Sequence, residues 1–414
     1  MNHRFHLLIA RTALGCLSVF ATAQTSLSAT TPLRVVAPSD ELRRSLSLAP
    51  FYAKVVLVGD FPVVGSAKVA DEALLEAGFL IRQMLGGRED ILAALAKSKT
   101  RFAVMAHDEF TTDIPEHADL KPKLYWDKRA RGLGASPARP AVSCGAENLL
   151  CYPGDPYAAE NILVHEFGHA IHEMGLRDVD PTFDRRLKAA YEHAMLAGLW
   201  KGKYAASNRM EYWAEGVQSW FDTNRFNDFE HNHVHTRVQL KEYDSDLAKL
   251  LAEIFGDGPW RYQKPADRKP PSPHLATYDS TQAPKFAWPE KLTAWYERFR
   301  RGEESMAPPE AVALAPLAPG AQSEWRSAKN SATTMLYFLN ASKQTLRLEW
   351  IDFDGQPQPY GLMRPGDHSE HQTFVGHVWR VTDAATNALA IYVAGQTPGT
   401  VVLTNAPSKA AAPR

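Results

Sequence analysis

The stretch His165-Glu166-Phe-Gly-His169 has the residue types of a metal-dependent hydrolytic site, at a spacing that one helix can present. On a helix, His165 and His169 lie one turn apart and point to the same side. Two neutral imidazoles at this spacing can bind one Zn²⁺ ion, and Glu166 beside them can act as a general base toward water. The alternative is a helix whose histidines are merely polar, because so short a pattern also occurs by chance.

The residues around this motif predict the helix that must position it. Apolar residues from Ile162 to Ile171 recur at helical spacing, and Gly175 stands where a C-terminal cap is expected. The longer zinc pattern, with a glycine and then a third histidine, fails because His172 and Gly175 occupy those two positions. A third ligand must therefore come from elsewhere in the chain.

Residues 204–221 predict a second helix, bulky and largely buried, which carries Glu211 and Glu215 among aromatic neighbours. Burying a carboxylate without a partner costs free energy, so each of the two glutamates needs a cation or a hydrogen-bond donor beside it. Coordinating a cation would supply such a partner, and so would hydrogen-bonding a liganding histidine. The alternative places both on the solvent edge of an amphipathic helix. With His165 and His169 upstream we favour the metal role, with Glu211 as the third ligand.

Together these two stretches resemble the glutamate-ligated zinc peptidases of the anthrax lethal factor type. There the His-Glu-Phe-Gly-His motif is followed by a Tyr, an Asn and Glu-aromatic-aromatic-Ala-Glu, which stand here at Tyr204, Asn208 and Glu211–Glu215. The resemblance implies an α+β zincin-like domain, mainly helical around the active site, with one zinc ion per chain. The implied roles are zinc ligation by His165, His169 and Glu211, base catalysis by Glu166, oxyanion stabilisation by Tyr204, and support by Glu215 and Asn208.

Beyond residue 322 the pattern changes to short alternating strands separated by turns, which predicts an all-β sandwich. This region resembles the β-domain of the von Hippel–Lindau tumour suppressor family, which grips hydroxyproline in an aromatic-walled pocket containing a Ser and a His. The matching positions are Trp350, Tyr360, Thr373, His377 and Trp379. Thr373 keeps a hydroxyl where the family has Ser, whereas Phe374 loses the polar contact of a Tyr. The alternative is that the aromatic residues are only sandwich core and rim.

Composition and the chain ends bound the remaining possibilities. The 414 residues are 45% hydrophobic and 22% charged with a formal net charge of −1, which gives no reason to expect nucleic acid as partner. Residues 1–23 predict a signal peptide for export, secreted or periplasmic, with a membrane anchor as the alternative. No later segment is apolar enough to cross a bilayer. Cys144 and Cys151 would then be an even pair in an exported chain, which predicts a disulfide rather than a metal half-site.

We expect the chain to be organised into consecutive segments. They are a signal peptide (1–23), a polar leader (24–45), the catalytic domain (46–300), an Ala/Pro-rich linker (301–322), the recognition sandwich (323–404) and a disordered tail (405–414). Within the catalytic domain, residues 54–105 predict a strand–helix–strand opening. Arg129 and Arg131 lie in the loop-rich region before the motif helix. They are candidates for contacting a substrate carbonyl or carboxylate, or are simply solvated or structural arginines.

These patterns predict a secreted zinc-dependent endopeptidase that acts on protein or peptide substrates. Its C-terminal module would bind proline- or hydroxyproline-rich extracellular proteins. Two alternatives remain open. One is a catalytically inactive binding protein that keeps the fold, and the other is a zinc hydrolase that acts on a non-peptide amide or a glycan-linked bond.

Overall fold

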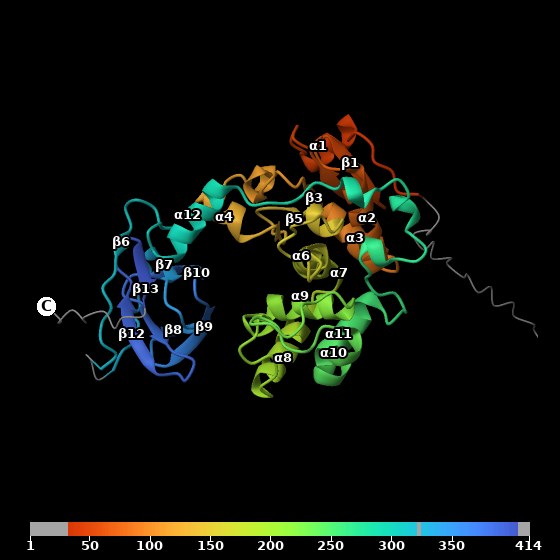
Figure 1. Cartoon of the computed structure of the whole chain (residues 1–414). Helices are drawn as coiled ribbons and strands as arrows, with labels where there is room; N and C mark the ends of the chain where they lie inside the picture. Colours follow the sequence, from red (N-terminus) through yellow and green to blue (C-terminus); the bar gives the residue numbers. More distant parts are fainter. Residues whose placement is uncertain (1–31, 321–323, 405–414) are drawn as a thin grey trace, which may run out of the picture.

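The computed structural model describes residues 32–320 and 324–404, which form an N-terminal mixed α/β part and a C-terminal β-sheet part (Figure 1). This agrees with the expected fold class at that level. The predicted signal peptide and the predicted tail lie outside the described residues. Of the expected polar leader, the described portion contains the start of α1 (Asp40–Leu46). None of the helices in the described ranges has the length and apolar character needed to cross a bilayer.

A five-stranded sheet with the order β1-β2-β3-β5-β4 supports the N-terminal part. The β1–β2 hairpin is antiparallel, β2, β3 and β5 run parallel, and the short β4 pairs antiparallel with β5 at the edge. The strands are β1 (Lys54–Val58), β2 (Phe61–Gly65), β3 (Arg101–Met105), β4 (Gly132–Leu133) and β5 (Ala141–Gly145). With α2 (Asp71–Leu85) and α3 (Glu89–Lys97) between β2 and β3, the observed order matches the strand–helix–strand pattern.

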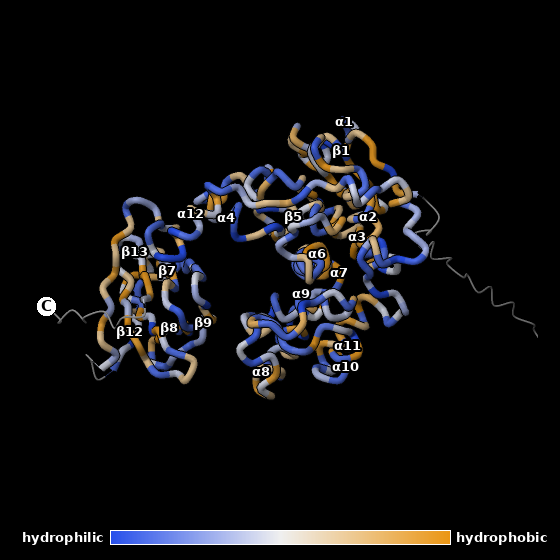
Figure 2. The backbone as a smooth tube through the Cα atoms, in the orientation of Figure 1, coloured by the Kyte–Doolittle hydropathy of each residue, from blue (hydrophilic) through white to orange (hydrophobic). Residues whose placement is uncertain are grey.

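The central strands are covered on both faces, and this fixes the motif helix α6 (Ile162–Ala170) against the sheet. Every residue of β2, β3 and β5 is buried, as expected for parallel strands inside an α/β layer. Phe167 of α6 packs its ring 5.4 Å from that of Phe61 and 6.2 Å from that of Phe102. Figure 2 shows apolar segments gathered around α6 and α7. The apolar face predicted from the sequence therefore anchors the helix.

The expected end of the motif helix at Gly175 is wrong. After α6 the chain continues through a π-helical turn (Ile171–Leu176) into α7 (Arg177–Val179). A Cβ atom on Gly175 would lie 2.9 Å from Cγ2 of Ile91 in α3. The glycine is therefore there to let two helices approach, and not to end one of them.

In Figure 1, α8 to α11 lie on one side of α6, whereas α4 and α12 lie together next to the C-terminal strands. Asp244 separates α10 from α11, and its side chain caps α11. The bounds of these helices and their neighbours are α4 (Lys123–Arg129), α5 (Ala146–Leu149), α8 (Phe183–Leu196), η4 (Tyr204–Ala206), α9 (Arg209–Trp220), α10 (Arg237–Tyr243), α11 (Ser245–Phe255) and α12 (Glu290–Arg300).

The predicted disulfide between Cys144 and Cys151 is wrong, because both are free thiols. Cys144 lies in β5 and belongs to the hydrophobic core, whereas Cys151 follows α5 with a left-handed backbone (φ 56°) and is only half-buried. Burial raises the pKa of each thiol, which disfavours the thiolate form of both. The number of cysteines suggested a pair, but it carries no information about which way each side chain points.

The C-terminal part consists of two four-stranded sheets, with orders β10-β7-β13-β6 and β12-β11-β8-β9. Leu336, Phe338, Leu348 and Trp379 pack between them as a buried core. The strands are β6 (Val312–Ala313), β7 (Thr333–Asn340), β8 (Leu346–Ile351), β9 (Pro357–Met363), β10 (His368–Phe374), β11 (Val378–Thr382), β12 (Ala388–Val393) and β13 (Gly399–Leu403).

The two parts are joined by more than the connecting chain. β6 lies within residues 301–322, the expected linker, and pairs in parallel with β13 of the sandwich. In addition, Leu339 of β7 is buried in one cluster with Tyr125 of α4 and with Trp295 and Phe299 of α12. The sandwich is thereby fixed against the N-terminal part.

Candidate metal centre

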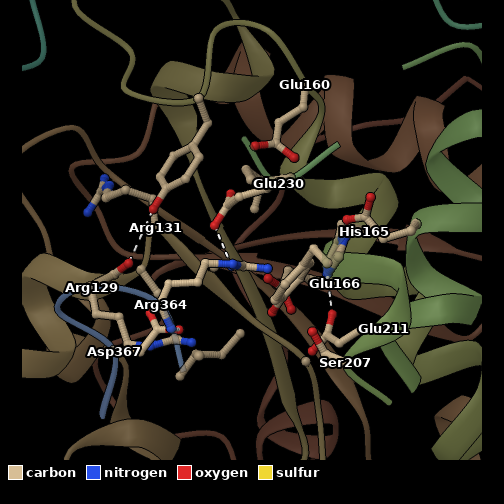
Figure 3. Close-up of a pocket in the computed structure, with 18 of the residues that line it drawn as sticks. Arg129, Arg131, Glu160, His165, Glu166, Ser207, Glu211, Glu230, Arg364 and Asp367 are labelled. Carbon is tan, nitrogen blue, oxygen red and sulfur yellow. Dashed lines mark hydrogen bonds and ion pairs between the residues drawn. The ribbon is translucent and has the colours of Figure 1, made fainter. Parts of the chain in front are cut away.

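His165 and His169 from α6 and Glu211 from α9 converge on one point. The Nε2 atom of His165 lies 3.2 Å from Nε2 of His169 and 3.2 Å from Oε2 of Glu211. The distance from Nε2 of His169 to Oε2 of Glu211 is 3.4 Å, so the three atoms form a nearly equilateral triangle. A tetrahedral zinc ion with bonds of about 2.0–2.1 Å holds its ligand atoms about 3.3–3.4 Å apart. The three side chains thus fit the dimensions of a zinc site, and Glu166 and Glu211 lie beside His165 in Figure 3.

Two asparagine caps set the start of the helices that carry this triangle. Asn161 caps α6 by accepting from the backbone N–H of Val164 at 3.1 Å. Asn208 caps α9 by accepting from the backbone N–H groups of Met210 and Glu211 at 2.9 and 3.0 Å. Satisfying these otherwise unpaired donors stabilises each helix by about 1 kcal/mol. Asn208, expected in a supporting role, therefore acts by positioning the first turn that bears Glu211.

Close packing of α6 on α9 brings the ligands together. A Cβ atom on Gly168 would lie 3.4 Å from Val217, so the glycine lets the two helix backbones approach. The indole N–H of Trp213 donates to the carbonyl of Gly168 at 2.9 Å and ties the helices at that level. Both contacts lie within one turn of His169, so they control the distance between the histidines and Glu211.

Gln218 fixes the protonation of His165, and the sequence interpretation missed it. Its Oε1 lies 2.9 Å from Nδ1 of His165, while its Nε2 donates to the carboxylate of Glu160 at 3.0 Å. Because Glu160 can only accept, the amide must turn its oxygen toward His165, and Nδ1 must carry the hydrogen. The Nε2 lone pair is then free for a metal. Gln218 lies seven residues after Glu211, on the same face of α9, which is the signal that could have identified it.

Glu215 is turned mainly to another partner. Its carboxylate lies 3.2 Å from Nε2 of His231 and accepts from Asn224 at 3.1 Å, whereas it is 3.6 Å from Nδ1 of His165. Burial would raise the pKa of Glu215, but the hydrogen bond from His231 outweighs it and lowers the pKa. Glu215, the residue expected to support a liganding histidine, thus has His231 as its nearer partner, while Gln218 makes the closer contact with His165.

The electrostatics of Glu166 and Glu211 differ although both are carboxylates beside the same histidines. Burial raises the pKa of Glu166, against the opposing effect of His165 and His169. Burial acts on Glu211 in the same direction, but its contacts with His169 and His165 hold its pKa well below the usual value. Glu211 is therefore the anionic ligand, and Glu166 is the carboxylate better suited to exchange a proton near neutral pH.

Tyr204 lies next to His165 in the lining of the cleft that contains the triangle. Its ring lies 6.3 Å from that of His165, nearly parallel to it, and burial raises its pKa, so the hydroxyl stays protonated and can donate. On its other side the guanidinium of Arg364, from the sandwich, lies 4.9 Å from the ring centre and pairs with Glu230. A residue of the C-terminal part thus contacts a residue of the candidate active site.

A cleft of about 590 Å³ contains the triangle and runs between the two parts. Edge strand β4 lines one side together with Gly134, whose missing side chain leaves room for His169, since a Cβ there would lie 3.0 Å from the His169 Cβ. The sandwich lines the other side with the end of β9, the turn that follows and the start of β10. Its lining residues are Leu362, Met363, Arg364, Gly366, Asp367, His368 and Ser369.

The two arginines noted before the motif helix have different surroundings. Arg131 is fully buried and its side chain pairs with Glu147 through two contacts of 2.5 and 2.9 Å, so its role is structural. Arg129 ends α4 and its exposed side chain lines the cleft.

The structure also brings together the five sandwich residues expected to form an aromatic pocket. Thr373 accepts from the indole N–H of Trp379 at 3.1 Å and lies 3.2 Å from Nδ1 of His377, and Trp350 packs its ring 5.2 Å from His377. Tyr360 is 49% exposed, with its ring edge-on to Trp379 at 4.6 Å.

A bulge explains the exposure of Tyr360. The pairing of β8 with β9 skips Tyr360, because Leu348 faces Gly361 while Glu349 faces Pro359. The extra residue is pushed out of the ladder, as in other bulges. His371, absent from the expected set, stacks 4.8 Å from Trp379 and lies 5.3 Å from Tyr360. It is two residues from Thr373 in β10, so strand alternation could have placed it on the same face.

Comparison with known proteins supports the C-terminal assignment. A family model described as the VHL beta domain matches residues 325–396, which confirms the resemblance predicted for the sandwich. Among solved structures, the Pro-Pro endopeptidase of Paenibacillus alvei is similar at 18% identity and a TM-score of 0.29, covering 48% of this chain and 98% of that one. A similarity at that level is too low to support an argument about the fold or activity of the N-terminal part.

Proposed function

We propose that the protein is a zinc-dependent endopeptidase with a zincin-like catalytic part. The observation that carries this proposal is the triangle of His165, His169 and Glu211, with edges of 3.2–3.4 Å and Glu166 next to it. A bound zinc ion would polarise the substrate carbonyl and lower the pKa of water at the site. Glu166 accepts the proton of the attacking water and delivers it to the leaving nitrogen. The Tyr204 hydroxyl donates to the carbonyl oxygen as negative charge develops there.

The edge strand in the cleft favours a peptide as substrate. β4 is the last strand in the sheet order, so one side of its backbone has no strand partner in the described part of the chain. An extended peptide can add to such an edge by main-chain hydrogen bonds, which fixes its direction across the active site. Gly132 and Gly134, without side chains, let this edge pack directly against Glu166 and His169, so a peptide added to it would lie beside those residues.

We further propose that the sandwich binds proline or hydroxyproline in the substrate. The family match, together with Thr373 and His377 meeting beside Trp379, supports this assignment. β9 leads from Tyr360 to Met363 and Arg364 in the cleft wall, so one extended peptide can occupy both places. We also propose export, secreted or periplasmic, on the composition of residues 1–23.

The catalytic proposal is tested by metal content and cleavage of gelatin by the full chain. We expect about one zinc per chain, cleavage that is lost with a chelator and restored by zinc, and no cleavage by Glu166→Gln although its zinc is retained. Zinc without cleavage would refute the peptidase proposal in favour of a binding protein or a hydrolase of another bond, and cleavage that survives chelation would overturn the metal assignment.

The sandwich proposal is tested with Glu166→Gln, which binds substrate without cleaving it. Titration with a hydroxyproline peptide and its proline counterpart should give tighter binding of hydroxyproline, and Thr373→Val should abolish the difference. Equal binding of the two peptides would refute the pocket while leaving the catalytic proposal intact.

A further inference from the structure

Arg129 is the cleft arginine whose charge is left unneutralised. Each of the other three has a carboxylate partner: Arg131 pairs with Glu147, Arg225 with Asp228, and Arg364 with Glu230. Within the described residues, no carboxylate oxygen lies within 4.0 Å of the Arg129 guanidinium. The side chain is exposed, yet it is exposed inside the cleft and not on an outer face.

The surroundings of Arg129 hold its backbone in place without neutralising its charge. The hydroxyl of Tyr157 donates to the Arg129 carbonyl at 3.2 Å. One turn earlier, Tyr125 packs its ring 5.0 Å from Phe299 of α12, which anchors α4. Tyr125, Tyr157, Tyr204 and Tyr296 line the cleft together with Arg129. Tyrosines offer hydroxyl and ring contacts but no negative charge at neutral pH.

Arg129 also lies near the residues that would carry out the reaction. It lines the same cleft as His165, Glu166 and Tyr204, and its charge acts on the carboxyl of Glu166 and on the phenol of Tyr204. Across the cleft the sandwich contributes Asp367, which accepts the backbone N–H of Arg364 at 2.7 Å and forms no ion pair with Arg129. Figure 3 shows Arg129, Arg364 and Asp367 at one end of the pocket.

We propose that Arg129 is a specificity-determining residue that binds a carboxylate of the peptide substrate close to the bond that is cleaved. A guanidinium presents a planar pair of N–H donors that matches a carboxylate, and it is more weakly hydrated than an ammonium group, so it gives up water readily. The carboxylate belongs either to an Asp or Glu side chain or to the C-terminus of a peptide. This inference rests on the proposed peptidase function and specifies the substrate of that same site.

The test uses the full chain and a library of N-acetylated, C-amidated decapeptides, whose cleavage sites are read by mass spectrometry. A cleaved sequence is then made in matched forms, with Glu or Gln at each position near the cut and with a free or amidated C-terminus. We expect one carboxylate to raise kcat/KM roughly 10- to 100-fold over its amide, the range that hydrogen bonds to a charged group convey. The Glu and C-terminal forms distinguish the two sources of the carboxylate.

Arg129→Gln should remove this preference, so that the ratio of kcat/KM for the acid peptide to that for its amide falls to about one. Arg129→Glu should instead favour a Lys at that position. Arg177→Gln, an exposed arginine on α7 outside the cleft, is the matched control and should keep the preference. Equal loss on acid and amide peptides in Arg129→Gln, or a wild type that does not discriminate, would overturn the proposal.

A latch between Arg129 and Asp367 is the competing role, and it is separable. If Arg129 served to hold the sandwich, Asp367→Asn would reproduce the effect of Arg129→Gln on both peptides, whereas a substrate-binding role predicts that Asp367→Asn keeps the preference. Should the wild type cleave no peptide at all, the proposed function fails, but the inference is still decided by titrating Glu166→Gln with the acid and amide forms of a library peptide pool. Tighter binding of the acid pool that disappears in the double variant with Arg129→Gln supports it, and equal binding refutes it.

Discussion

Replacing Gln218 by Leu tests how the metal centre is held in shape. Gln218 is fully buried, and its amide is the group that lies within hydrogen-bonding distance of Nδ1 of His165. Leucine has a similar size but cannot accept, so the variant leaves the Nδ1–H of His165 without its partner. His165 can then rotate or change tautomer, and either change moves the Nε2 lone pair away from the ligand triangle.

The expected loss follows from what the amide contributes. Leaving a buried donor unsatisfied costs about 1–3 kcal/mol, and removing the partner of a liganding histidine typically weakens metal binding about 10- to 100-fold. We therefore expect the zinc dissociation constant of Gln218→Leu to rise by that factor. Glu215→Gln should change it less than about fivefold, because Glu215 lies 3.6 Å from His165 and is engaged by His231.

The measurement is a competition for zinc between the protein and a coloured chelator, with circular dichroism as the check on folding. Cobalt substitution adds a second readout, since its visible spectrum reports the geometry of the ligands. If Glu215→Gln weakened zinc binding more than Gln218→Leu, the assignment of Gln218 as the orienting residue would be wrong. Equal zinc affinity in all three proteins would refute the entire argument about the orientation of His165.

Four further outcomes are expected. Glu166→Gln should keep its zinc, and its cleavage rate should fall about 10²- to 10⁴-fold. Chelator titration measures the zinc and peptide hydrolysis measures the rate. A variant as active as the wild type would exclude Glu166 as the base. Gly168→Ala should fold normally, because its Cβ would lie 3.4 Å from the Val217 side chain, at ordinary contact distance. The larger side chain of Gly168→Val should clash there and lower the free energy of unfolding in urea by about 1–3 kcal/mol. Equal stabilities of the two variants would contradict the close contact between the helices. Burial lowers the pKa of His371 to about 4, so the unfolded chain binds more protons than the folded one between pH 4 and about 6.5. Protonation of His371 should therefore lower the unfolding free energy by up to about 3 kcal/mol as the pH is reduced from about 6.5 to 4, and His371→Gln should flatten the slope, whereas an unchanged slope would locate the titration elsewhere. In alkylation with iodoacetamide, half-buried Cys151 should react before Cys144, which should wait for unfolding; a mass that shifts by two on reduction would instead reveal a disulfide.

The ligand geometry was predictable because helical spacing fixes direction. Once His165 and His169 were assigned to one helix, it followed that they point to the same side. The buried carboxylate of Glu211 then needed either a cation or a hydrogen-bond donor as its partner. The residues that hold this arrangement were harder to identify. Gln218 and His231 act through the packing of α9 on α6 and on a distant loop, and no local pattern determines that packing.

The contribution of the sandwich to the cleft could not be read from the sequence either. Arg364 lies 160 residues after Tyr204, and their contact depends on how α12 and β7 place two separate folding units. The disulfide prediction failed for a related reason, since a count of cysteines ignores the core around Cys144. The strands of the sandwich were easier to predict, because apolar and polar residues alternate along segments separated by turns. Such alternation indicates a strand with one buried face.

The pairing of β6 with β13 has a practical consequence for handling the protein. A protease that cuts between residues 303 and 311, where exposed residues alternate with half-buried ones, severs the backbone but leaves the buried cluster of Leu339 with Trp295 and Phe299. The nicked product therefore elutes as a single particle and separates into two fragments only in denaturant. Intact migration on a sizing column is thus no proof of an unbroken chain.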